Sequence, residues 1–148
     1  MASETGPYLQ VATFCETVIE SKTGVMSLIN VVDRHTINTA GPSAPEDMPP
    51  QRIPWTLVLA FRSGEARGSA QLMITPEDPS GIKRKPVGIP VHFEGGNRGF
   101  QVILKVDFEA KDPGIYWFLI HLDGQFVTKV PLEVVYGRFS VGQTPPGR

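Results

Sequence analysis

This chain of 148 residues is long enough for one domain with its own core, and its 41% hydrophobic content excludes a disordered protein. With 14 basic and 15 acidic residues the net charge is −1, which argues against a nucleic-acid-binding protein. The single cysteine, Cys15, excludes an internal disulfide, and no apolar run reaches the roughly 18 residues of a membrane-spanning helix. We therefore expect no nucleic-acid partner and no membrane association.

The predicted elements are strands throughout, because apolar and β-branched residues alternate between turns of Gly, Pro, Asp and Asn. A first strand is expected over 8–20 and a second over 25–37. The apolar residues of the first strand that are predicted to share one face are Leu9, Val11, Cys15 and Ile19. A loop over 38–52 follows, since its four prolines cannot donate hydrogen bonds to a sheet.

The middle of the chain predicts four strands separated by Gly- and Pro-containing turns: 53–62, 67–75, 87–94 and 100–109. The first two are expected to be joined by a hairpin at 63–66. Gly95-Gly96-Asn97 is expected to be a plain turn before the last of them. The basic triplet Lys83-Arg84-Lys85 lies in a loop over 76–86 and is interpreted as solvated.

The last two strands, 115–122 and 125–136, are predicted to form a hairpin. Asp123-Gly124 supplies the positive φ angles of a type I′ turn, whose twist matches that of the flanking strands. Pro131 removes one ladder donor, so its strand is expected to be an edge or bulged there. The predicted organisation is given by three ranges: a flexible N-terminus over 1–7, a single β-sandwich domain over 8–136 and a flexible tail over 137–148.

The motif Asp112-x-Gly114-x-Tyr116 resembles the tyrosine corner of immunoglobulin-like domains, in which the Tyr hydroxyl binds backbone at a strand corner. The resemblance implies that Phe118 is a core position and that Trp55 can serve as the central packing tryptophan. The cysteines of antibody domains are missing, so the resemblance is to the architecture alone. We predict an all-β fold, an antiparallel immunoglobulin-like β-sandwich of about 7–8 strands.

A second resemblance covers nearly the whole chain, through the segments Phe14-Cys15-Glu16, Lys22-Thr23-Gly24 and Leu28-Ile29-Asn30-Val31-Val32-Asp33. Together with the apolar strand at 55–61 and the Gly-x-Tyr-x-Phe hairpin, they resemble a family of small uncharacterised bacterial β-sandwich proteins of unknown function. The resemblance implies a stand-alone bacterial cytosolic sandwich and assigns no catalytic residue. A cytoplasmic location is also expected because residues 1–6 show no leader pattern.

Sequence motifs of catalysis or metal binding are not found. The histidines His35, His92 and His121 have no metal-binding spacing. Cys15 is interpreted as a small buried hydrophobe rather than a nucleophile. Because no nucleophile–base pair is readable, we expect no enzyme, no cofactor and no metal site.

The alternation of the strand at 115–122 gives the one functional lead. If Tyr116 and Phe118 face the core, alternate residues must face outward. The residues of outward parity, one of them from the strand at 53–62, are Trp117, Leu119, His121 and Val58. Apolar outer faces mark interaction surfaces, and Trp is enriched at their hot spots. The alternatives are that the loop over 38–52 or the tail at 138–141 covers this face, or that a ligand stacks on its Trp.

We therefore predict a non-enzymatic protein-interaction or oligomerisation module, whose partner is another protein or a second copy of the chain. The alternative is a small-molecule or carbohydrate binder that uses Trp117 and His121, since an aromatic platform with a polar neighbour suits stacking. An enzyme without a readable motif is the third hypothesis.

Overall fold

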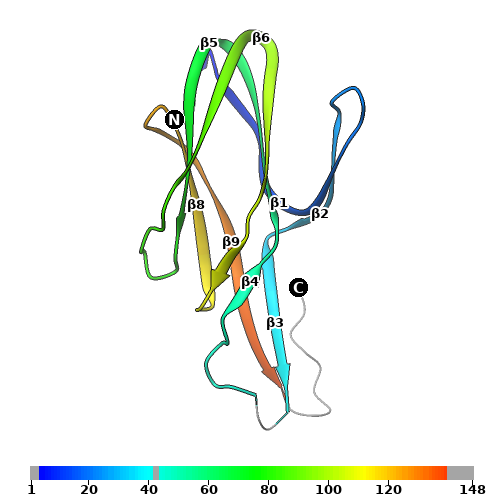
Figure 1. Ribbon diagram of the computed structural model, residues 1–148, viewed down its shortest axis with the longest axis vertical. Coiled ribbons are helices and arrows are strands. Elements are labelled where there is room, and N and C mark those ends of the chain that lie inside the picture. The colour runs from blue at the N-terminus through cyan, green and yellow to red at the C-terminus, as the bar shows by residue number, and fades with distance from the viewer. Residues whose placement is uncertain (1–3, 42–43, 140–148) are drawn as a thin grey trace.

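The computed structural model describes residues 4–41 and 44–139, and their secondary structure is entirely β (Figure 1). The strands in chain order are β1 (Tyr8–Glu20), β2 (Met26–Val32), β3 (Arg34–Ala40), β4 (Gln51–Ile53), β5 (Thr56–Glu77), β6 (Val87–Lys105), β7 (Phe108–Ala110), β8 (Gly114–Leu122) and β9 (Gln125–Phe139). None of the described residues forms a helix that is long and apolar enough to span a membrane.

The strands pack as two layers that share the long β5–β6 pair. β1 pairs with the first part of β5, from Thr56 to Arg62, and β2 pairs with the outer edge of β1. β8 pairs with the last part of β5, from Leu72 to Glu77, and is followed in the sheet by β9 and β3. β6 runs antiparallel along the other edge of β5. All pairs are antiparallel except β3–β9, so the fold is an all-β, immunoglobulin-like sandwich, as predicted.

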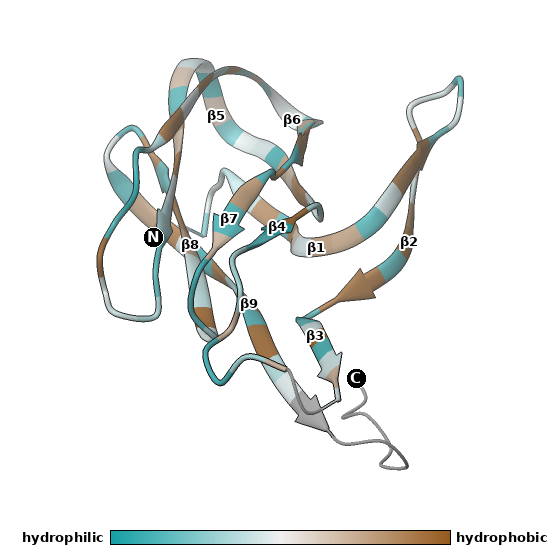
Figure 2. Cartoon of the chain, turned by 60° about the horizontal axis from the view of Figure 1, so that its bottom comes forward, coloured by the Kyte–Doolittle hydropathy of each residue, from teal (hydrophilic) through white to brown (hydrophobic). Residues whose placement is uncertain are grey.

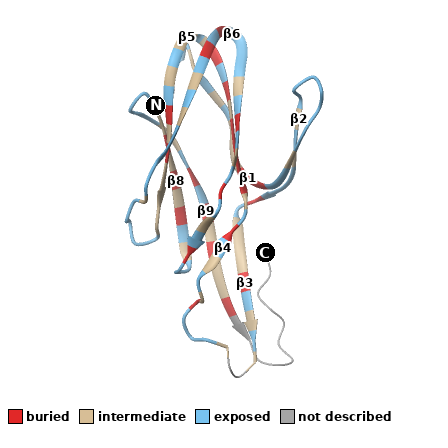
Figure 3. Ribbon diagram, viewed as in Figure 1, coloured by how far each residue is buried: buried red, intermediate tan, exposed pale blue. Residues whose placement is uncertain are grey.

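The core lies between the layers, where Phe14 of β1 meets Phe118 of β8. Their ring centroids are 5.0 Å apart in an edge-to-face contact, although the two strands are not hydrogen-bonded to each other. Both side chains are fully buried, as are the inward positions of β8 and β9 in Figure 3. Face-to-face packing of two sheets is therefore what buries the apolar residues.

The tyrosine corner and the last hairpin are confirmed. The Tyr116 hydroxyl donates a 2.7 Å hydrogen bond to the Asp112 carbonyl, and Phe118 two residues on is a core residue. Asp123 and Gly124 have φ angles of 48° and 79°, as a type I′ turn requires. Pro131 lies where β9 has β8 on one side and is not yet paired with β3, whose ladder starts at Glu133.

The predicted hairpin at 63–66 and the plain turn at Gly95-Gly96-Asn97 are both wrong. β5 and β6 continue through these segments, which lie opposite each other, with Gly64 paired to Gly96. Gly64 and Gly96 have φ angles of 58° and 63° and lie at register shifts of the ladder. Glycines with positive φ form β-bulges as well as turns, and here they bend a strand pair instead of reversing it.

The strand predicted over 25–37 is two strands. β2 pairs with β1 and ends at Val32, whereas β3 begins at Arg34 and runs parallel to β9 in the other layer. The chain passes from one layer to the other at Asp33, whose carbonyl accepts a hydrogen bond from the Glu133 amide. The buried residues on the two sides of Asp33, Val32 and Ile37, have opposite parity, as expected where the chain passes from one strand to another in a different layer.

The first strand has the predicted bounds, but its faces differ from the prediction. A register shift between Leu9 and Val11 puts Leu9 opposite Phe61 and Val11 opposite Ala60. The bulge moves Val11, Cys15 and Ile19 to the outer face, and Phe14 becomes the inward residue.

Trp55 and Arg84 also differ from expectation. Trp55 is only half-buried at the margin of the core, where its indole Nε1 donates to His35 Nδ1 at 3.1 Å. It precedes β5 and so cannot reach the centre, which Phe14 fills. Arg84 is not a solvated loop residue: its Nε lies 2.6 Å from Asp78 Oδ1, and its guanidinium lies over the Phe108 and Tyr116 rings.

The segments predicted as flexible termini are partly in the fold. Thr5 accepts a backbone hydrogen bond from Glu65, and β9 extends to Phe139 beside β3. The rest of the predicted tail, 140–148, lies outside the described residues, as do residues 1–3.

Candidate functional site

The outer face of β8 carries three of the four predicted site residues. Trp117, Leu119 and His121 alternate with buried neighbours and are each half-buried. On the flanking strands, Trp117 lies opposite Glu77 and Pro131. The outward parity predicted for these three residues is therefore correct, although their side chains are half-buried and not fully exposed to solvent.

The ring of Trp117 already has a partner. The Lys129 ammonium lies 4.1 Å from the centroid of the ring, a cation–π contact that occupies one ring face. A sugar stacked there would have to displace this ammonium. His121 packs edge-on against Phe126 with centroids 5.7 Å apart. A small-molecule or carbohydrate ligand at Trp117 stays a prediction.

The predicted loop over 38–52 is shorter in the structure, because β3 extends to Ala40 and β4 begins at Gln51. Its described residues Pro45 and Met48 lie on the core side of the sheet. Pro45 accepts a 2.6 Å hydrogen bond from the Tyr136 hydroxyl, and Tyr136 shares the inward parity of buried Leu132 and Val134. Met48 of the same loop belongs to the core cluster. These contacts do not place the loop over Trp117. The side chains at 138–141, the other predicted cover, lie outside the described residues.

Val58 does not join the β8 face. It pairs with Thr13 and Ile103, in the layer of β1, β5 and β6, whereas β8 pairs with β5 only from Leu72 onward. Its outward parity is correct, since Leu57 and Leu59 lie in the core cluster and Val58 does not. The sandwich therefore separates Val58 and Trp117 onto the outer faces of different layers.

The second candidate surface is the hairpin of β1 and β2, which stands away from the body of the protein (Figures 1 and 2). We call residues 16–31 the arm. Four large apolar side chains of the arm are exposed: Ile19 (56%), Val25 (65%), Ile29 (39%) and Val31 (59%). Sequence reasoning missed this surface, although the uncharged run Met26–Val32 was a visible signal.

These side chains continue an apolar face across the layer. Val31 lies opposite Cys15, and Ile29 lies opposite Thr17, so both share a face with Ile19. The same face extends over buried Cys15 and Val58 to Ile103, which is 38% exposed. Because Val58 is fully buried, we call only the exposed set Ile19, Ile29 and Val31 the arm face.

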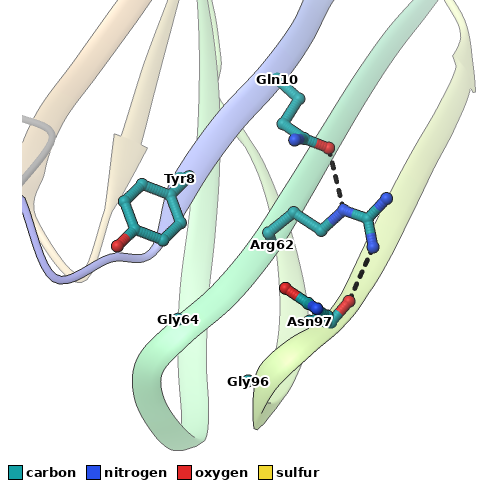
Figure 4. A pocket seen from close by; sticks show the side chains of 6 residues that line it. All are labelled: Tyr8, Gln10, Arg62, Gly64, Gly96 and Asn97. Carbon is teal, nitrogen blue, oxygen red and sulfur yellow. Dashed lines mark hydrogen bonds between the residues drawn. The ribbon is translucent and has the colours of Figure 1, made fainter.

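Two hollows lie along the same side of the layer. The first, of about 530 Å³, is lined by Tyr8, Gln10, Arg62, Gly64, Gly96 and Asn97 (Figure 4). Arg62 is held there by hydrogen bonds from Nε to Gln10 Oε1 at 2.9 Å and from Nη1 to the Asn97 carbonyl at 2.7 Å. The second, of about 340 Å³, shares Gln10 and Arg62 with the first and reaches Gly24 at the arm tip. A concave surface therefore runs from the bend of β5 to the arm.

The titratable candidates lie apart from one another. Cys15 is buried on β1, where its Sγ donates to the Thr17 carbonyl, and burial raises the pKa of the thiol above its ordinary value. His35 contacts Trp55, and His92 is exposed on β6. Over residues 4–41 and 44–139, no three His, Cys, Asp or Glu side chains are grouped in a way that could hold a metal ion.

Comparisons with known proteins point to a family but to no activity. A model of a family of unknown function, DUF6941, matches residues 10–135. An immunoglobulin-like protein (PA1606) from Pseudomonas aeruginosa is similar in structure, with 10% sequence identity and a TM-score of 0.41. That similarity covers 89% of this chain and 99% of the other. No curated protein matches the sequence.

Proposed function

The chain belongs to the DUF6941 family of unknown function, and we propose that it is a non-enzymatic protein-interaction module that binds its partner through the arm face. The proposal rests on the exposure of Ile19, Ile29 and Val31 on one face of the β1–β2 hairpin. Soluble domains rarely expose adjoining large apolar side chains without a partner.

The arm face supports this function better than the β8 face does. Trp117 and Leu119 are half-buried, and Lys129 covers part of the indole, so the exposed apolar side chain on the outer face of β8 is Ile115, which is 43% exposed. The arm also projects, which lets a partner contact both of its faces. The second hollow, between Gly24 at the arm tip and Gln101, can accommodate a side chain of the partner. As the family resemblance implies, we place this module in the bacterial cytoplasm.

A pair of double variants tests the proposal. The arm variant, Ile29→Lys with Val31→Lys, puts two charges on the arm face. The control variant, Ile82→Lys with Val87→Lys, puts the same charges at two exposed apolar positions elsewhere, 65% and 42% exposed. Each tagged protein is expressed in a bacterial host, crosslinked and purified, and the proteins that accompany it are quantified by mass spectrometry.

In each case an untagged copy of the same chain is expressed in the same cells, so that self-association is detected as well. We expect at least one protein, another protein or the untagged copy, to accompany the wild type and the control variant but to be lost from the arm variant. Circular dichroism verifies that all three chains are folded. If the same proteins accompany all three chains in equal amounts, the arm is not the binding surface and the proposal fails.

A further inference from the structure

We propose that the partner of the arm is a second copy of this chain, bound by antiparallel pairing of the two β2 edges. This inference rests on the proposed function, because it assigns an occupant to the same surface. Among residues 4–41 and 44–139, β2 is the first strand of the sheet order and pairs with β1 alone, so its other row of backbone groups has no partner strand there. Such an edge is a template for another strand.

β2 differs from the other edge strands in having no protection. Its seven residues, Met26–Val32, include no charged residue and no proline. Among the described strands, the other edges carry such residues: β3 has Arg34, β4 has Arg52, β7 has Glu109, and β6 has Pro90, Glu94, Arg98 and Lys105. Proteins use charge and proline to keep edges from pairing, so an edge without them is open to a partner strand.

The unpaired edge is bordered by apolar side chains on both faces of the arm. Ile29 and Val31 are exposed on one face, and Met26 and Leu28 are half-buried on the other. The most regular part of the edge is 26–29, because Asn30 has a φ of 53° and its side-chain Nδ2 donates to Glu16 Oε2 within the hairpin. A partner strand along 26–29 would bury these side chains as cross-strand pairs.

A second copy meets no charge repulsion at this edge. An antiparallel two-fold pair brings β2 against itself, and because β2 is uncharged no like charges are placed opposite each other. The net charge of the whole chain is −1, so long-range repulsion between two copies is weak. The edge is thus its own complement in hydrogen bonding, in apolarity and in charge.

Analytical ultracentrifugation of the wild-type chain, the arm variant and the control variant tests the proposal. From micromolar to millimolar concentration we expect a monomer–dimer equilibrium for the wild type. The dissociation constant should rise more than about tenfold in the arm variant, since each added lysine must be desolvated at the interface. The control variant should dimerise as the wild type does.

Amide hydrogen exchange distinguishes edge pairing from other dimers. Peptides that contain residues 26–32 should gain protection as concentration rises, whereas the outer edge of β6 should not. A wild type that stays monomeric at every concentration overturns the proposal, and so does a dimer that adds no protection to 26–32. A monomer that still captures a different protein through the arm leaves the proposed function standing, so the two failures are distinguishable.

Discussion

The Tyr116 hydroxyl donates to the Asp112 carbonyl at 2.7 Å and thereby ties the start of β8 to the loop before it. Tyr116 is buried, and its ring packs against Phe108, with centroids 5.3 Å apart. Arg84 lies beside the same two rings and donates to the Glu109 carbonyl at 2.8 Å. Arg84 of the β5–β6 loop thus contacts both β7 and β8 at this end of the sandwich.

Replacing Tyr116 by Phe should lower the free energy of unfolding by about 1–2 kcal/mol, because a partly buried hydrogen bond is lost while the ring is kept. Urea denaturation followed by fluorescence measures the change. Tyr8→Phe is the matched control, since the Tyr8 hydroxyl also donates to a carbonyl four residues earlier, that of Glu4, at an exposed site. Equal stabilities for the two variants would contradict the structural role of the corner.

Stability should also fall at alkaline pH because of Tyr116. Burial raises the pKa of its phenol above the ordinary value. The folded phenol therefore keeps its proton after the unfolded one has lost it, from about pH 10 upward. The unfolded state then binds fewer protons, so the free energy of unfolding decreases as pH rises.

This pH dependence can be measured by urea denaturation at a series of pH values between about 8 and 11. The decline above about pH 10 should be less steep in Tyr116→Phe than in the wild type. Parallel curves for the two proteins would exclude Tyr116 as its source.

Arg84→Met should destabilise the fold by about 1–3 kcal/mol, because hydrogen bonds of a charged, partly buried donor to Asp78 and Glu109 are lost. The methionine keeps most of the apolar stem, so the change isolates the guanidinium. Lys85→Met removes a neighbouring exposed charge and should change stability by less than about 0.5 kcal/mol. Thermal denaturation of both variants checks the difference, and equal melting temperatures would mean that Arg84 is only solvated.

The Cys15 thiol should react slowly with a disulfide reagent such as DTNB while the protein is folded. The thiol is buried, and its raised pKa keeps the thiolate fraction low. We expect the rate in buffer to be at least about tenfold below the rate in denaturing urea. Reaction at the same rate in both conditions would show that the outer face of β1 opens readily.

Local chemistry was enough to predict parts of the fold in which neighbours along the chain make the contacts. The Asp123-Gly124 turn and the Tyr116 corner depend on residues within a few positions of each other, and both are confirmed. The bend at Gly64 and Gly96 was mistaken for turns because a positive φ serves a bulge and a reversal equally well. Whether such a glycine forms a bulge or a turn depends on which strand pairs with its segment.

The sequence by itself determined the all-β class, the last hairpin and the outward parity of Trp117 and Val58. It did so because a strand exposes its side chains with period two whatever lies beside it. The strand pairing in the structure places Trp117 and Val58 in different layers and makes β2 an edge among the described strands. The uncharged run Met26–Val32 is visible in the sequence, but its position at an edge depends on how distant strands pair, which a pattern along one chain does not contain.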